Sequence, residues 1–127
     1  MAKAYTDLEQ SKRLAEFLPL KSADMYYEPH DNECSSYSIH CGKFVYIDYH
    51  LLLSWQRDKV VPCWSLTALF DALPKTIGSY SKMMGYFDDA YHCDYLDEDG
   101  ESIGLGTTAD NLVDAVYEMV LKLNKPK

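Results

Sequence analysis

A cysteine stands just before a predicted helix in the stretch "VPCWSLTALFDALP", residues 61–74. Helix N-termini stabilise thiolates and can lower the pKa of a cysteine well below ~8.5. Cys63 could therefore act as the nucleophile of a cysteine hydrolase or transferase, with His92, on a predicted strand, as its base. The residues that could orient this histidine are Asp94, Asp110 and Asn111.

The same stretch is also explained by the construction of a helix. Ser65 is a good N-cap, and Trp64 before it can pack on Leu69 as a hydrophobic staple. The step "CWS" resembles the nucleophile helix of papain-like hydrolases, but the Cys-Gly-Ser that precedes that nucleophile is absent, and Pro62 stands in front of Cys63. We therefore expect a structural helix entrance and assign no catalytic residue.

Metal and ligand patterns are incomplete. The two His-Cys pairs, His40-Cys41 and His92-Cys93, lie on predicted strands, where neighbouring side chains point to opposite faces. Neither pair has the C-x-x-C spacing of a zinc site. The acidic run "DYLDEDGES" fails the calcium-loop pattern at Tyr95 and Gly106, and "GLGTTAD" lacks the lysine of a phosphate-binding loop. We predict no metal and no cofactor.

Tyrosine is the least ordinary part of the composition, with 11 residues. Tyrosine suits half-buried sheet surfaces and is also enriched at protein interfaces. If helices cover one face of a sheet, alternating tyrosines on the other face could bind a protein partner or a second copy of the chain. The predicted interaction surface is made of Tyr26, Tyr37, Tyr46, Tyr91 and Tyr95.

The charge of the chain is acidic, with 12 Lys and Arg against 20 Asp and Glu and a net charge of −8. Such a balance disfavours direct binding of DNA or RNA. An acidic surface could instead mimic nucleic acid and block a DNA-binding protein, although charge of this size is also common for solubility. No apolar run approaches the ~20 residues of a membrane span, and no signal peptide is visible. We expect a cytoplasmic protein with four reduced cysteines and no membrane partner.

Two helices are predicted at the ends of the chain. The first covers residues 7–18, with Thr6 and Glu9 as its capping box. The second begins after Thr108, a plausible cap, and carries an apolar stripe from Leu112 to Leu123. Residues 124–127 are predicted to be a frayed tail.

Strands fill most of the space between the helices. β-type runs are predicted in "SADMYYE", on both sides of a turn at Gly42, at residues 79–84, and in a hairpin of 91–96 with 101–105. The order α-β-β(-β)-α-β-β-β-α does not alternate one helix with one strand. It predicts a single α+β domain over residues 1–127, with one mainly antiparallel sheet covered by about three helices.

Three blocks of the sequence are similar to a known family. They are "YTDLEQSKRLAEFLPLKSADMYY", "VPCWSLTALFDALP" and "DNLVDAVYEMVLKL", which together cover a little under half of the chain. In this order they resemble a family of small proteins from Bacteroides-type gut bacteria and their phages or mobile elements. The resemblance implies a bacterial or phage origin and a cytoplasmic setting, and it transfers no catalytic residue.

These observations favour a non-enzymatic protein that acts by binding another protein or itself. A cysteine hydrolase using Cys63 and His92 is the main alternative, and an acidic nucleic-acid mimic is the third.

Overall fold

The computed structural model describes residues 3–31, 33, 36–46 and 59–124. It confirms an α+β fold, with three α-helices and seven strands. The elements in chain order are α1 (Leu8–Leu14), the 3-10 helix η1 (Leu20–Ser22), β1 (Met25–Pro29), β2 (Tyr37–Cys41), the 3-10 helix η2 (Phe44–Tyr46), β3 (Val61–Cys63), α2 (Leu66–Asp71), β4 (Thr76–Ile77), β5 (Tyr80–Phe87), β6 (Ala90–Leu96), β7 (Thr107–Ala109) and α3 (Leu112–Leu123).

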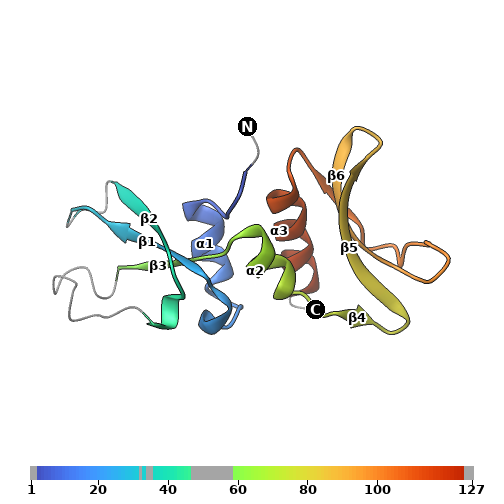
Figure 1. Ribbon diagram of the computed structural model, residues 1–127, viewed down its shortest axis with the longest axis horizontal. Helices are drawn as coiled ribbons and strands as arrows, with labels where there is room; N and C mark the ends of the chain where they lie inside the picture. The colour runs from blue at the N-terminus through green and yellow to red at the C-terminus, as the bar shows by residue number, and fades with distance from the viewer. Residues whose placement is uncertain (1–2, 32, 34–35, 47–58, 125–127) are drawn as a thin grey trace.

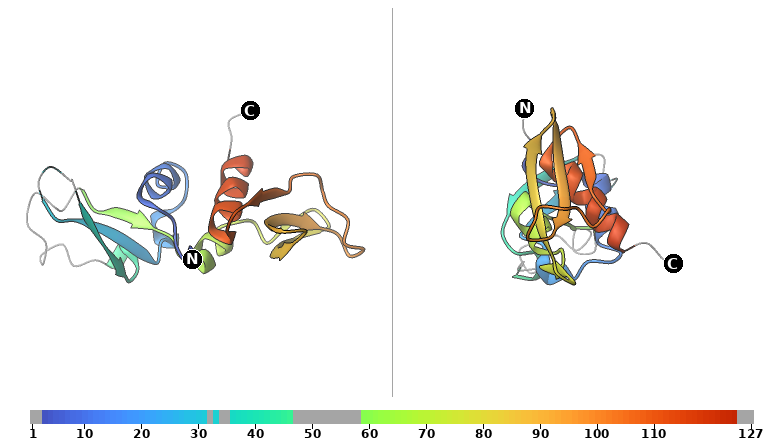
Figure 2. Two further views of the ribbon diagram at one scale, coloured as in Figure 1. Left: turned by 90° about the horizontal axis from the view of Figure 1, so that it is seen from above. Right: turned by 90° about the vertical axis from the view of Figure 1, so that its right-hand side faces the viewer.

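The strands form two antiparallel sheets rather than the single sheet that we predicted. The order is β2-β1-β3 in one sheet and β4-β5-β6-β7 in the other. All three α-helices lie between the sheets, so each sheet has one face toward the helices (Figures 1 and 2). Sequence periodicity predicts where strands lie and which of their side chains share a face. It does not predict where one sheet ends and another begins, because that depends on which strands pair.

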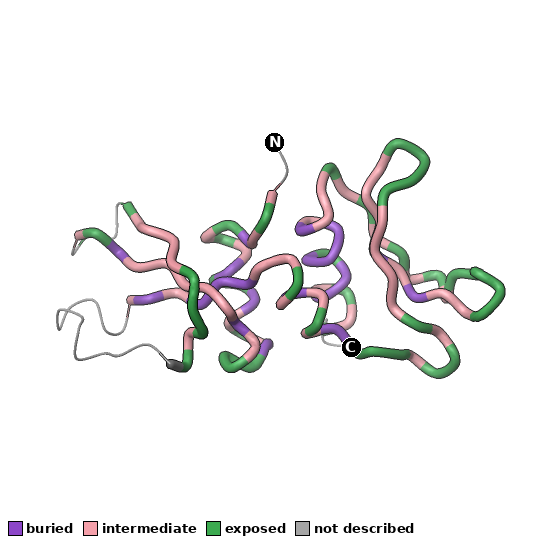
Figure 3. The backbone as a smooth tube through the Cα atoms, in the orientation of Figure 1, coloured by how far each residue is buried: buried purple, intermediate pink, exposed green. Residues whose placement is uncertain are grey.

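The core lies in this helical layer and on the sheet faces that adjoin it. The buried segments in Figure 3 are concentrated in the helices and in short parts of the adjoining strands. α3 contributes most, because six of its twelve residues are buried, as the apolar stripe predicts. They are Val113, Ala115, Val116, Tyr117, Met119 and Val120.

The helix entrance at Ser65 is confirmed. The Ser65 hydroxyl accepts a hydrogen bond from the backbone N–H of Ala68 at 3.2 Å, as an N-cap does. The same hydroxyl donates to Asp24 at 2.5 Å, so the cap is tied to the chain before β1. Trp64 and Leu69 are both buried in the core.

The first helix begins one residue later than predicted. Asp7 is the N-cap, and it forms the capping box with Gln10 instead of Thr6 with Glu9. Thr6 is completely buried, and its hydroxyl hydrogen-bonds to the hydroxyl of Ser11 and accepts from the N–H of Trp64. A contact with a residue 58 positions away therefore removes Thr6 from capping. The helix is also shorter than predicted, and ends at Leu14.

Several predicted boundaries in the second half also change. β5 extends to Phe87, past the expected end at residue 84. No strand forms at 101–105, where a single bridge joins Ser102 to Leu96; β6 pairs instead with β5 and β7. Thr108 lies inside β7, and Asn111 is the N-cap of α3.

Two further predictions concern residues at the edge of the described ranges. After β2, Gly42 has φ 137° and is followed by η2, while the rest of the second predicted strand, from residue 47, lies outside the described residues. Asn124 is the C-cap of α3 and donates to Val120 rather than belonging to a frayed tail, whereas 125–127 lie outside the described residues.

We expect the substitution Thr6→Val to destabilise the protein by about 1–3 kcal/mol, because it leaves the buried N–H of Trp64 without its acceptor and removes the hydroxyl that bonds to Ser11. Urea denaturation would measure the change in the free energy of unfolding. Thr67→Val, at an exposed position on α2, is the control and should change it by less than about 0.5 kcal/mol. Equal effects of the two substitutions would contradict the role given to Thr6.

Candidate functional site

Cys63, the candidate nucleophile, is a buried structural residue. It is 0 % exposed on β3, and its thiol donates to the backbone carbonyl of Thr6 at 3.4 Å. Burial raises the pKa of the thiol, and hydrogen bonds with Thr6 and Ser11 only partly offset that increase. A buried thiol with a raised pKa is a poor nucleophile, since the thiolate is the reactive form.

The structure does not bring Cys63 and His92 together. Cys63 belongs to the three-stranded sheet and His92 to the four-stranded one, with the helices between them (Figure 1). The His92 ring stacks on Phe87 at 3.8 Å between centroids, and its Nε2 donates to the Phe87 carbonyl at 2.9 Å. Asp94, one of its proposed orienting residues, accepts from Ser102 instead.

The His-Cys pairs likewise have structural surroundings. The Nε2 atom of His40 lies 3.0 Å from a carboxyl oxygen of Glu28, and its ring stacks on Tyr26. Cys93 is buried, and burial together with the neighbouring charge of Asp94 raises its pKa to about 12. In the described ranges, no group of three or more His, Cys, Asp or Glu side chains is placed to hold a metal ion. Cys34 lies outside those ranges.

The predicted tyrosine surface is divided between the two sheets. Tyr26 and Tyr37 lie on neighbouring strands of the three-stranded sheet, but the strand register places them on opposite faces. Tyr26 packs against the ring of His40, and Tyr37 packs against the ring of Tyr27. Tyr91 lies on the other sheet. The side chain of Tyr46 is outside the described part of the chain.

Tyr95 is a core residue and not a surface residue, which corrects the sequence prediction. Its side chain is 0 % exposed, and its hydroxyl donates to the carbonyl of Pro74 at 2.6 Å. Burial raises its pKa to about 12. Tyr91 and Tyr95 share one face of β6, because they are four residues apart on a strand. Only Tyr95 lies where the helices cover that face.

The exposed aromatic side chains gather at the tip of the β5–β6 hairpin. We call Tyr86, Phe87, Tyr91 and His92 the hairpin aromatic cluster, in which Tyr86 and Tyr91 lie on one face of the hairpin and Phe87 and His92 on the other. Tyr86 and Phe87 are 59 % and 46 % exposed, the two largest values among the exposed large hydrophobic side chains of the described residues. Tyr86 packs on Tyr91 at 4.7 Å between ring centroids, and Phe87 stacks on His92. Each exposed ring is therefore held in place by a ring of β6.

A two-residue turn positions the hairpin aromatic cluster. Asp88 and Asp89 have φ values of 52° and 60°, the left-handed pair that a type I′ hairpin turn requires. Aspartate tolerates this conformation better than most residues. Tyr86 and Phe87 are not among the predicted interaction residues. The stretch "YFDDAY" nevertheless indicates an aromatic hairpin tip, because two turn-forming acids stand between aromatic residues.

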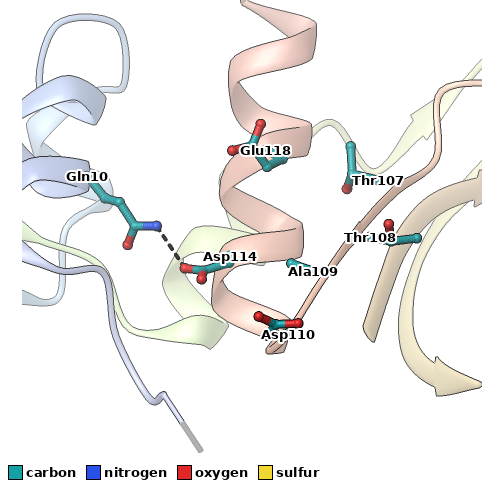
Figure 4. A pocket seen from close by; sticks show the side chains of 7 residues that line it. All are labelled: Gln10, Thr107, Thr108, Ala109, Asp110, Asp114 and Glu118. Carbon is teal, nitrogen blue, oxygen red and sulfur yellow. Dashed lines mark hydrogen bonds between the residues drawn. The ribbon is translucent and has the colours of Figure 1, made fainter. Parts of the chain in front are cut away.

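A separate acidic groove of about 550 Å³ lies between α3 and β7, with Gln10 of α1 at its side (Figure 4). Its acids are Asp110, Asp114 and Glu118. Burial favours the neutral form of Asp114, but hydrogen bonds from Lys3 at 2.7 Å and Gln10 at 2.8 Å outweigh it and hold the pKa of that carboxyl below its usual value. These bonds join the N-terminal segment and α1 to α3, so they stabilise the helical layer.

Comparisons of the chain with protein-family models, with curated proteins and with solved structures each found no match. Among the helices of the described ranges, none is long and apolar enough to cross a membrane.

Alkylation of the native protein should separate its cysteines by burial. Cys41 is exposed and should be alkylated rapidly, whereas Cys93 is buried with a pKa of about 12 and should react on the order of a thousandfold more slowly at pH 8 than an ordinary thiol. Cys63 should also be protected. Mass spectrometry of the digested protein would give each rate, and denaturant should make all the rates similar. Fast alkylation of Cys63 in the native protein would contradict its structural role.

Proposed function

We propose that this chain is a non-enzymatic cytoplasmic protein that acts by binding another protein or itself through the hairpin aromatic cluster. The observation that carries the proposal is the exposure of Tyr86 and Phe87, one on each face at the tip of a structured hairpin. Aromatic side chains are enriched at protein interfaces relative to the rest of the protein surface.

The geometry of the cluster supports binding because little order must be gained on association. Tyr86 and Phe87 each already pack on a ring of β6, so fewer side-chain rotamers remain to be fixed. Aromatic residues are enriched at the centres of interfaces, where they combine a large apolar area with a polar group. The acidic residues of the turn add a charged rim.

The alternatives have less support. A cysteine hydrolase would need a reactive thiol near a histidine, and the thiol of Cys63 is buried on the other sheet from His92. A nucleic-acid mimic would need free acids along one face, whereas Asp114 in the acidic groove is engaged by Lys3 and Gln10. The free, exposed thiol of Cys41 suits a reducing compartment such as the cytoplasm.

Site-specific photo-crosslinking in cells tests the proposal. A photoreactive phenylalanine analogue at position 86 should give a discrete adduct, either with a second copy of the chain or with another protein. The same analogue at Thr67, exposed on α2, is the matched control and should give none. A lack of adduct at position 86, or equal adducts at both positions, would contradict the proposed binding site.

A further inference from the structure

The long strand β5 has one edge that is mostly open. Its first edge pairs with β6 from Ser81 to Phe87. Its second edge pairs with β4 only at Tyr80 and Ser81, beside the lower end of β5 in Figure 1. Among the described residues, no strand pairs with the second edge over 83–87.

The hydrogen-bonding groups on this open edge can be identified from the register. Phe87 and Ala90 close the two-residue turn and therefore form a hydrogen-bonded pair, so alternate residues of β5 bond to β6. The backbone N–H and C=O groups of the residues between them face the second edge. The N–H of Lys82, for example, donates to the carbonyl of Lys75. It follows that the N–H and C=O groups of Met84 and Tyr86 face the open edge.

The open segment also lacks the features that usually protect an edge strand. Between Met83 and Phe87 there is no proline and no charged residue. Gly85 stands in the middle, although no described neighbour requires glycine there: within the described residues a Cβ at this position would meet the end of Met83 at 3.9 Å, an ordinary contact distance. Glycine inside a strand often marks the close approach of another backbone.

We infer that this edge pairs with the same edge of a second copy of the chain, antiparallel and about a twofold axis at Gly85. The inference rests on the proposed function and names the partner. In this register Met84 lies opposite Tyr86 of the other copy, and both are residues whose N–H and C=O groups face outward. The two four-stranded sheets would then become one continuous sheet, with the hairpin aromatic clusters of both copies beside the new interface.

Charge favours this antiparallel arrangement. The open segment has the exposed Lys75, just before β4, near one end and Asp88 and Asp89 at the other. The ammonium group of Lys82 is not available, because it donates to the carbonyls of Phe70 and Leu73. An antiparallel copy brings the acidic turn of each chain to the basic end of the other. Opposite charges on paired strands are favourable and like charges are not, so a parallel copy would be disfavoured. The complementarity of the edge with itself favours a second copy over an unrelated strand.

Sedimentation velocity over about 1–300 μM protein tests the inference, a range in which weak dimers are populated. The wild-type chain should shift from monomer to dimer as concentration rises. Tyr86→Pro removes an outward N–H that no strand of the described ranges pairs with, and Tyr86→Ala removes the same ring but keeps the N–H. We expect Tyr86→Pro to raise the dissociation constant at least about tenfold above that of Tyr86→Ala, since it removes hydrogen bonds from both copies.

A second variant keeps the test decisive if Tyr86→Pro does not fold. Lys75→Glu, at an exposed position, places acids against the acidic turn of the other copy and should weaken the dimer roughly tenfold. A wild-type chain that stays monomeric, equal dimers of the Pro and Ala variants, or an unchanged dimer of Lys75→Glu would overturn the inference. A monomeric chain whose position 86 still crosslinks to another protein would overturn only self-pairing and leave the proposed function in place.

Discussion

The packing of α3 against the four-stranded sheet is the contact on which the rest of the structure depends. The helix buries its apolar stripe on β6 and β7, where Cys93 and Tyr95 are also buried. Its length limits how much of the sheet it covers. Twelve helical residues span about 18 Å, whereas the eight residues of β5 span about 27 Å. The hairpin therefore extends past the end of α3, as Figure 1 shows, and carries Tyr86 and Phe87 into solvent.

The other half of the chain is joined to α3 through polar contacts as well as apolar ones. Thr6, buried beside Trp64, links the start of α1 to the chain that leads into α2. Trp64 itself donates through Nε1 to Ser22 at 2.9 Å, so the largest buried side chain has its polar group satisfied. These hydrogen bonds join residues that are far apart in the sequence. They hold the helices as one layer against which both sheets pack.

The parts of the fold that depend on local sequence could be predicted, and the parts that depend on distant contacts could not. Ser65 caps a helix because its hydroxyl reaches an N–H three residues away, and the prediction holds. Thr6 looks equally suited, but its hydroxyl is taken by Ser11 and Trp64. Tyr91 and Tyr95 are equivalent by strand periodicity, and only the position of the helices decides that Tyr95 is buried.

The candidate site shows the same limit. The motif at Cys63 suggested a catalytic nucleophile. The thiol is buried, however, and His92, its proposed base, lies on the other sheet. The tyrosine count pointed to binding, but the cluster that is exposed contains Tyr86 and Phe87, which pattern reasoning did not select. An open strand edge cannot be seen in a sequence at all, because it is defined by the strand that does not form beside it.

Amide hydrogen exchange of Met84 and Tyr86 tests the central claim most directly, since their N–H groups face the open edge of β5. At low protein concentration both amides should exchange rapidly, while the amides of Met83 and Gly85, bonded to β6, exchange slowly. As the concentration rises, the exchange of Met84 and Tyr86 should slow as the two edges pair. Exchange of these two amides that is equally fast at every concentration would contradict the account.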